Sequence, residues 1–299
     1  MSTATANQHL WRRGPRYLLG HSKPEQRRLR KQAEELRQES NSLFDRVGLR
    51  SGGRAIDIGC GPQGVLDLLS ERVGSTGLVV GIERDDKSVA AARQFAAGRA
   101  LRNVKVFQGD AAEVGLPGDI FDLVHARLVL VNIPNAEAVV GEMVRLARPG
   151  GMVASHEADY LPHLCDPPLR AWDRLFQIYR DYSSANGIDL FIGRRTHRLF
   201  HEAGLVDIEV NPVIHVYPQG HNRRTIFLDF LQQFSVRKSF NLKTIVGSHA
   251  SVQSFHRLKN DGIEEIAQRG PELGLGTQSF PQETEEPTAP LLDLVYGKG

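Results

Sequence analysis

Cysteine is scarce in this sequence: the 299 residues include only two, Cys60 and Cys165. Two cysteines so far apart give neither a disulfide framework nor the ligand spacing of a metal site. The N-terminus has no apolar signal core, and no apolar run reaches the length of a membrane span. We therefore expect a reduced, cytoplasmic protein without a membrane partner.

An excess of charge of one sign is also missing. Lys and Arg number 37 against 35 Asp and Glu, which gives a formal net charge of +2. This balance is too even to predict binding to nucleic acid or to an anionic membrane. The basic run at residues 27–31 is typical of a solvated helix face. The 40% of hydrophobic residues predicts a packed globular core.

The stretch that organises the chain is residues 55–64, AIDIGCGPQG. A short apolar strand ends at Asp57, and Gly59, Gly61 and Gly64 follow in the spacing G-x-G-x-x-G before a helix-like run. In this setting the backbone can approach a ligand at a helix N-terminus. The carboxylate of Asp57 would repel a pyrophosphate but attract an ammonium or sulfonium, so the pattern favours S-adenosylmethionine over a dinucleotide.

Two more acids stand at predicted strand ends. Glu83 follows an apolar run and lies 19 residues after Gly64, a spacing at which a carboxylate reaches a ribose diol. Asp110 follows the next strand and is placed to accept from an adenine amino group. Each acid alone is typical of a turn or a helix cap. Together with Asp57 they predict an adenosine-type ligand at the carboxyl ends of the strands.

Strands and helices alternate regularly from residue 54, which predicts a parallel sheet. A capping box at residues 22–25 precedes it and predicts one continuous helix of about six turns. The predicted strands are 55–58, 78–82, 104–107, 121–130, 152–155, 206–217 and 291–295. We divide the chain into an arm and cap helix (1–48), a cofactor-binding core (49–160), a helical lid (161–193) and a C-terminal part (194–299) with a helical insertion at 222–268.

Four segments resemble motifs of class I S-adenosylmethionine-dependent methyltransferases: AIDIGCG, GIER at 81–84, GDA at 109–111 and LARPGGMV at 146–153. The likeness covers about residues 50–160 and is greatest to the UbiE-like enzymes that methylate small molecules. It implies a Rossmann-like α/β fold with helical lid insertions. The implied sheet has seven strands in the order 3-2-1-4-5-7-6, with the last strand antiparallel.

The same resemblance implies which residues contact S-adenosylmethionine. They are Asp57, Gly59 and Gly61 at the amino-acid end, Glu83 and Arg84 at the ribose, Asp110 and Ala111 at the adenine, Arg127 and Leu128 at the methionine, and Tyr17 over the methionine end. One departure is that Pro62 and Gln63 move the third glycine to position 64, which reshapes the turn without adding charge. The Asn/Asp-Pro-Pro-aromatic signature of exocyclic-amine methylation is absent, which argues against a nucleic-acid base as acceptor.

Methyl transfer is an in-line displacement, so alignment and exclusion of water supply much of the rate. A base is needed only where the acceptor must lose a proton. His156 and Asp159, expected on a rim after the fifth strand, are the candidate bases; the alternative is that they only shape the pocket. Their cluster with Glu157 is too short to predict a metal site, and we expect no metal.

An aromatic group follows the same strand and is the candidate acceptor-binding surface. It consists of Tyr160, Trp172, Phe176 and Tyr179, and core packing is the alternative reading of the three on the helix.

The sequence thus predicts methyl transfer to a small, aromatic or polyketide-like acceptor at oxygen, carbon or nitrogen, in secondary metabolism. Two alternatives stay open. One is a methyltransferase-fold protein that binds the cofactor and catalyses a rearrangement or cyclisation without methyl transfer. The other is an NAD-dependent oxidoreductase. The sequence also leaves open whether the protein forms a homodimer.

Overall fold

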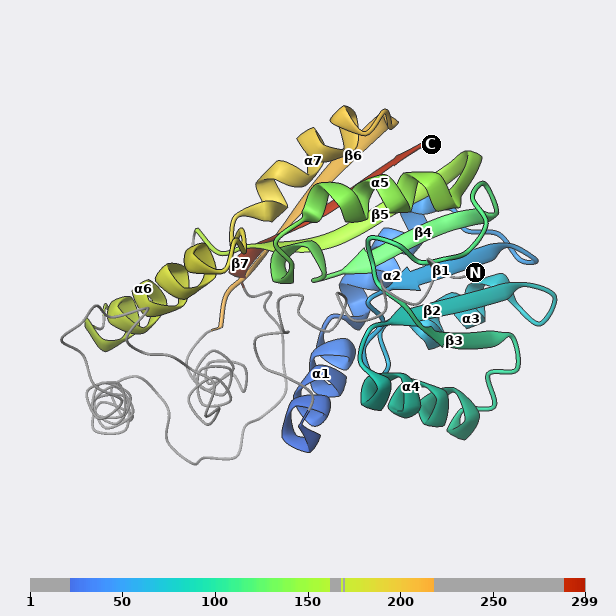
Figure 1. Ribbon diagram of the computed structural model, residues 1–299, viewed down its shortest axis with the longest axis horizontal. Helices are drawn as coiled ribbons and strands as arrows, with labels where there is room; N and C mark the ends of the chain where they lie inside the picture. The colour runs from blue at the N-terminus through green and yellow to red at the C-terminus, as the bar shows by residue number, and fades with distance from the viewer. Residues whose placement is uncertain (1–21, 162–167, 169, 218–287, 299) are drawn as a thin grey trace, which may run out of the picture.

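The computed structural model describes residues 22–161, 168, 170–217 and 288–298, in which strands and helices alternate (Figure 1). The elements in chain order are α1 (Lys23–Glu35), α2 (Arg37–Val47), β1 (Arg54–Ile58), α3 (Leu66–Val73), β2 (Leu78–Glu83), α4 (Asp86–Gly98), β3 (Val104–Gln108), β4 (Phe121–Arg127), the 3-10 helix η3 (Leu130–Asn132), α5 (Ala136–Leu146), β5 (Ala147–Asp159), α6 (Arg170–Ala185), α7 (Ile192–Glu202), β6 (Val206–His215) and β7 (Thr288–Lys298).

Five neighbouring strands, β3-β2-β1-β4-β5, are parallel, which confirms the predicted α/β fold. Beyond β5 the described strands continue with β7 and then β6. β7 pairs antiparallel with β5 on one side and with β6 on the other. The register aligns Asp57 with His125, and Arg127 with His156. Because registered residues and residues two apart share a face, these four side chains lie on one face of the sheet.

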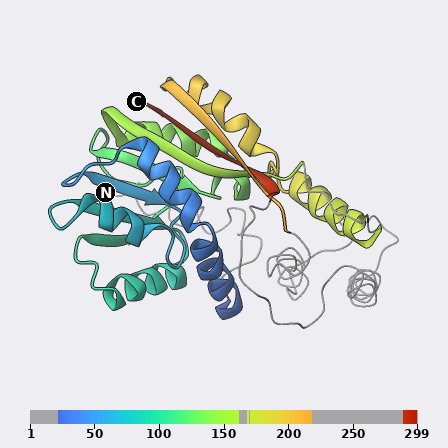
Figure 2. The same cartoon turned by 180° about the vertical axis from the view of Figure 1, so that it is seen from behind.

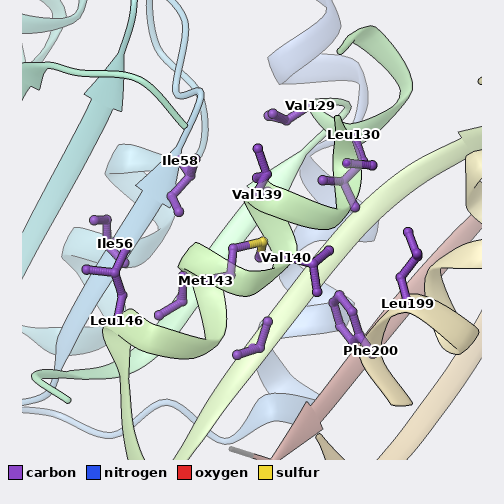
Figure 3. Close-up of a cluster of buried hydrophobic side chains, with 14 of the residues drawn as sticks. Ile56, Ile58, Val129, Leu130, Val139, Val140, Met143, Leu146, Leu199 and Phe200 are labelled. Atoms are coloured by element: carbon purple, nitrogen blue, oxygen red, sulfur yellow. The ribbon is translucent and has the colours of Figure 1, made fainter. Parts of the chain in front are cut away.

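Helices cover both faces of this sheet (Figures 1 and 2). On one face, residues of α2, α3 and α4 such as Phe44, Leu69 and Val89 pack in one buried cluster with strand residues. On the other face, α5 and α7 pack against β1, β4 and β5 (Figure 3). Burial on both faces explains why the strands read as nearly continuous apolar runs in the sequence.

The predicted continuous helix before the sheet is wrong. Ser22 does cap a helix, since its Oγ accepts from the backbone N–H of Glu25 at 3.2 Å. That helix ends at Glu35, and Leu36 (φ −96°, ψ 14°) separates it from α2. Leu36 is only 1% exposed and packs against Ala158 of β5. The chain therefore changes direction where an apolar side chain is anchored to the sheet.

Several predicted strand ends are also wrong. β4 stops at Arg127 rather than at residue 130, and β6 stops at His215 rather than at 217. β5 runs on to Asp159 rather than to 155, because residues 152–159 pair with the distant β7. The expected rim at residues 156–159 is therefore part of the sheet.

The helix α6, predicted at 169–185, projects beyond the carboxyl ends of the strands (Figures 1 and 2). Tyr17, Cys165 and the expected insertion at 222–268 lie outside the described residues. Within the described part of the chain, every helix is too short or too polar to cross a lipid bilayer.

We expect Leu36→Ala to lower the free energy of unfolding by about 2–4 kcal/mol, because the buried joint between α1 and α2 loses its packing against β5. Leu161→Ala is the matched control: Leu161 follows the same end of β5 but is 51% exposed, so its loss should stay within about 0.5 kcal/mol. Urea denaturation measures both. Equal losses would show that Leu36 does not fix this joint.

Candidate functional site

The glycine turn after β1 has a backbone that other residues rarely adopt. Gly59, Gly61 and Gly64 have φ values of +68°, +57° and +56°. A Cβ on Gly64 would lie 2.3 Å from Oδ2 of Asp57, whereas a Cβ on Gly61 would meet nothing within 4 Å. The turn is therefore tightly packed beneath Gly64 and open beside Gly61, as a backbone must be where a ligand comes close.

The carboxylate of Asp57 lies beneath this turn. It is 2% exposed, accepts from the backbone N–H of Val65 at 3.2 Å, and lies 2.8 Å from Nδ1 of His125 on β4. Both carboxylate oxygens thus have partners within the protein. Asp57 fixes the shape of the turn through these contacts, and its expected contact with the amino-acid end of the cofactor stays a prediction.

Glu83 joins the end of β2 to the glycine turn. One oxygen accepts from the backbone N–H of Gly61 at 3.0 Å and the other from that of Asp85 at 2.9 Å. Cys60 lies between the two acids, and burial together with the charges of Asp57 and Glu83 raises the pKa of its thiol well above the usual value. The structure thus brings two of the three predicted acids to one turn.

The other residues predicted to contact the ribose and the adenine of the cofactor follow β2 and β3. Arg84 is exposed, and its carbonyl oxygen accepts from the side-chain amide of Gln108 at 3.0 Å. Asp110 accepts from the backbone N–H of Ala112 at 2.9 Å, so it shapes its own turn, and Ala111 is half-buried beside it. These residues lie at the carboxyl ends of β2 and β3, the edge at which ligands of open α/β sheets bind.

Arg127 ties the end of β4 to the same turn from the other side. Its guanidinium donates to the carbonyl oxygen of Gly64 at 3.0 Å and to Oγ of Ser40 on α2 at 2.9 Å. Burial lowers the pKa of Arg127, while the charge of Asp57 opposes this. A cation is therefore held next to the turn where the cofactor's amino-acid end is expected.

The segment after Arg127 turns sharply. Leu128 has φ +54°, which is rare for a bulky residue, and its N–H donates to the carbonyl oxygen of His156 at 2.8 Å. Val129 then packs onto the glycine turn: a Cβ on Gly59 would lie 2.5 Å from its Cγ2. Strained backbone of this kind is concentrated at functional sites, and here it brings two turns into contact.

Glu157 of β5 binds this segment. Its carboxylate accepts the backbone N–H groups of residues 129, 130 and 131 at 3.0–3.1 Å and the hydroxyl of Ser155 at 3.2 Å. The side chain is fully buried, and burial raises the pKa of Glu157 to about 7 although the four hydrogen bonds oppose the shift. Sequence reasoning placed Glu157 on the expected rim and considered it as a metal donor, and it missed this contact.

His156, a candidate base, is completely buried in β5 on the face that also carries His125 and Arg127. Burial and the charge of Arg127 hold its pKa well below the usual range, so the ring is neutral near pH 7. Neither ring nitrogen has a hydrogen-bond partner among the described residues. It is therefore an enclosed imidazole, not the exposed rim group that the sequence predicted.

Asp159, the other candidate base, forms an ion pair. Arg194 of α7 donates to both of its carboxylate oxygens, and the N–H of Leu161 donates to one of them at 2.9 Å. The carboxylate is fully buried, whereas the guanidinium is 45% exposed. This contact anchors α7 to the end of β5.

The predicted aromatic group is divided by the fold. Tyr179 is 3% exposed and meets Tyr160 edge-to-face at 5.9 Å between ring centroids. Trp172 and Phe176 are half-buried and pack against the same core. Tyr179 therefore packs in the core, whereas Tyr160, Trp172 and Phe176 keep part of their side chains exposed to solvent.

His125 and Val129 are site residues that sequence reasoning missed. The available signal was that His125, like Arg127, interrupts a predicted strand with many apolar residues. Its partner Asp57 is 68 residues away, so the pair cannot be read from local spacing.

Fold and site together define a class: a Rossmann-like α/β protein whose glycine turn and strand-end acids suit an adenosine-containing cofactor. A sequence model of the "Methyltransferase domain" family matches residues 49–204, more than half of the chain. The chain is 30% identical over 188 residues to demethylmenaquinone methyltransferase of Geobacillus kaustophilus, covering 57% of this chain and 78% of that one. It is 38% identical over 131 residues to nocamycin O-methyltransferase of Saccharothrix syringae, and the match covers 44% of this chain and 45% of that one.

This chain belongs to the methyltransferase-domain family. The match confirms the family and the cofactor, S-adenosylmethionine, that the motifs predicted. Among solved structures, phosphoethanolamine N-methyltransferase 2 of Haemonchus contortus shares the fold with a TM-score of 0.50 and 17% identity, covering 87% of this chain and 52% of that chain.

We expect Gly64→Ala to cost more stability than Gly61→Ala. Both alanines must adopt a left-handed φ, at about 1–2 kcal/mol each, but only the Gly64 variant forces a methyl group into Asp57. The total loss for Gly64→Ala should be about 2–5 kcal/mol. Urea denaturation of both variants measures the difference, and similar losses would contradict the close packing described here.

Proposed function

We propose that this protein transfers the methyl group of S-adenosylmethionine to a small-molecule acceptor. The observation that carries the proposal is the contact between Glu83 and Gly61, which places a carboxylate at the open side of the left-handed glycine turn. The similarity to the demethylmenaquinone and nocamycin methyltransferases supports a small-molecule acceptor. A place in secondary metabolism and a cytoplasmic location are part of the same proposal.

The residues present fit the cofactor by their chemistry. The cofactor supplies an electrophilic methyl group on a sulfonium. Glu83, with Arg84 beside it, is the proposed partner of the ribose hydroxyls, and Asp110 with Ala111 that of the adenine. Gly59 and Gly61 offer backbone to the amino-acid end above Asp57, and Arg127 offers a cation to its carboxylate. The open space beside Gly61 leaves room for such a ligand.

Alignment and exclusion of water are the proposed sources of the rate. Val129, which follows Leu128, packs against Gly59 of the glycine turn, and Tyr160, Trp172 and Phe176 offer half-buried aromatic surface to an acceptor. For an acceptor that must lose a proton, His156 and Asp159 stay the candidate bases, and both side chains are fully buried. The neutral ring of His156 can accept a proton, though its low pKa makes it a weak base, whereas Asp159 is bound by Arg194.

Calorimetry and product mass test this function. We expect S-adenosylmethionine to bind and NAD not to bind. With a panel of hydroquinone, enol and amine acceptors, the product should gain about one CH₂ as S-adenosylhomocysteine forms, since the reaction moves a methyl group and releases a proton. A product of unchanged mass would support the rearrangement alternative. Binding of NAD without S-adenosylmethionine would contradict the proposal.

We expect Glu83→Ala to weaken S-adenosylhomocysteine binding by about 5- to 150-fold, because a charged hydrogen bond to the ribose is lost. The matched control is Asp85→Ala, which removes the cap that Asp85 provides to the N–H of Ser88 at the start of α4. That variant should lose about 1 kcal/mol of stability but keep its affinity. Equal affinity losses would mean that Glu83 acts only on the fold.

A further inference from the structure

Glu157 of β5 is a buried carboxylate that accepts four hydrogen bonds and that the proposed function leaves without a role. Its two oxygens bind three successive backbone N–H groups, at residues 129, 130 and 131, and the hydroxyl of Ser155. These amides follow the left-handed Leu128, where the chain leaves the sheet and its N–H groups have lost strand partners. Buried amides without partners are costly, so this turn depends on the carboxylate.

The turn that Glu157 holds touches the glycine turn. Val129, whose N–H donates to Glu157 at 3.1 Å, packs so closely on Gly59 that a Cβ there would lie 2.5 Å from its Cγ2. On its other side the turn packs into the core, where Leu130 and Val139 lie together (Figure 3). A change in the turn therefore moves Val129 relative to Gly59 rather than being absorbed by empty space.

We propose that Glu157 is a positioning residue for cofactor binding: its ionised carboxylate holds residues 129–131 so that Val129 presses the glycine turn into its binding conformation. This inference rests on the proposed function, because it assigns Glu157 to the same cofactor site. Protonation turns one carboxylate oxygen into a hydroxyl, which is a weaker acceptor and adds an O–H donor, so the hydrogen bonds to the three amides are weakened. Cofactor affinity then depends on the charge of Glu157, although Glu157 itself touches no cofactor atom.

Other charged groups near Glu157 are paired with one another. On the same sheet face, Asp159 is paired with Arg194 of α7, and Arg195 of α7 lies 3.7 Å from Glu137 of α5. Burial raises the pKa of Glu157 to about 7.

On the neighbouring strand, β7 brings Asp293 into register with Glu157. His156 precedes Glu157 in β5 but belongs to the opposite face, and its pKa lies well below the usual range.

The test measures S-adenosylhomocysteine binding by the full chain at pH 6, 7 and 8. We expect the parent protein to bind about fivefold more tightly at pH 8 than at pH 6, an effect as large as that of one hydrogen bond. Glu157→Gln should bind weakly at every pH, because an amide cannot accept all three N–H groups. The ligand's own titration is common to all variants, so the difference between variants isolates Glu157.

Glu142→Gln is the matched control. Glu142 of α5 is also a buried carboxylate that accepts a backbone N–H, from Val114 at 2.8 Å, but Arg145 lowers its pKa. It stays ionised from pH 6 to 8, so this variant should keep the pH profile of the parent. If Glu157→Gln does not fold, Ser155→Ala replaces it: loss of the hydroxyl raises the pKa of Glu157, and the midpoint of the binding profile should move to higher pH.

The free energy of unfolding provides a second readout, and its pH dependence should be opposite to that of cofactor affinity. Since the pKa of Glu157 is raised in the folded protein, the folded state retains a proton that the unfolded chain releases above about pH 4.3. The stability contributed by this group therefore falls as pH rises from about 4.3 to 7, and Glu157→Gln should flatten the slope. A purely structural role would move stability and affinity together, whereas positioning by the ionised form moves them in opposite directions.

A parent protein with pH-independent affinity, a Glu157→Gln variant that keeps the parent's affinity and profile, or an unshifted Ser155→Ala midpoint would each overturn the inference. Failure of the parent to bind S-adenosylhomocysteine at any pH would instead contradict the proposed function.

Discussion

Carboxylates at the ends of parallel strands hold the turns that follow, and the site depends on this arrangement. A chain that leaves a strand carries backbone N–H groups that must find partners. Asp57 accepts from Val65, Glu83 from Gly61, and Glu157 from the segment after β4. Each acid therefore stabilises a loop conformation at the edge where the family binds its cofactor, in addition to any contact with a ligand.

This arrangement gives the acids two functions that compete for the same oxygen atoms. Both oxygens of Glu83 accept backbone N–H groups, yet a carboxylate still has lone pairs to offer a ribose hydroxyl. Asp57 is more completely enclosed, between His125 and the glycine turn. The proposed direct role in cofactor binding therefore suits Glu83 better than Asp57, whose carboxylate contacts the turn and His125.

The two sides of β5 have different chemistry because side chains alternate along a strand. His156 faces the same way as Arg127, in a polar environment below α2. Glu157 and Asp159 face the other way, where one binds the turn after β4 and the other binds Arg194 of α7. Three polar residues that look like one cluster in the sequence are therefore two structural anchors and one enclosed imidazole.

The sequence by itself determined the α/β class, the glycine turn and the acids at the ends of the first three strands. These features rest on local rules: a strand reads as an apolar run, a left-handed turn requires glycine, and a motif has fixed spacing. The tertiary structure alone decided where the N-terminal helix breaks, where β4 and β5 end, and what His156, Glu157 and Asp159 contact. Leu36 turns the chain because it packs on Ala158, and β5 continues to Asp159 because β7 pairs with it. Such contacts join residues far apart in the chain, so no local pattern encodes them.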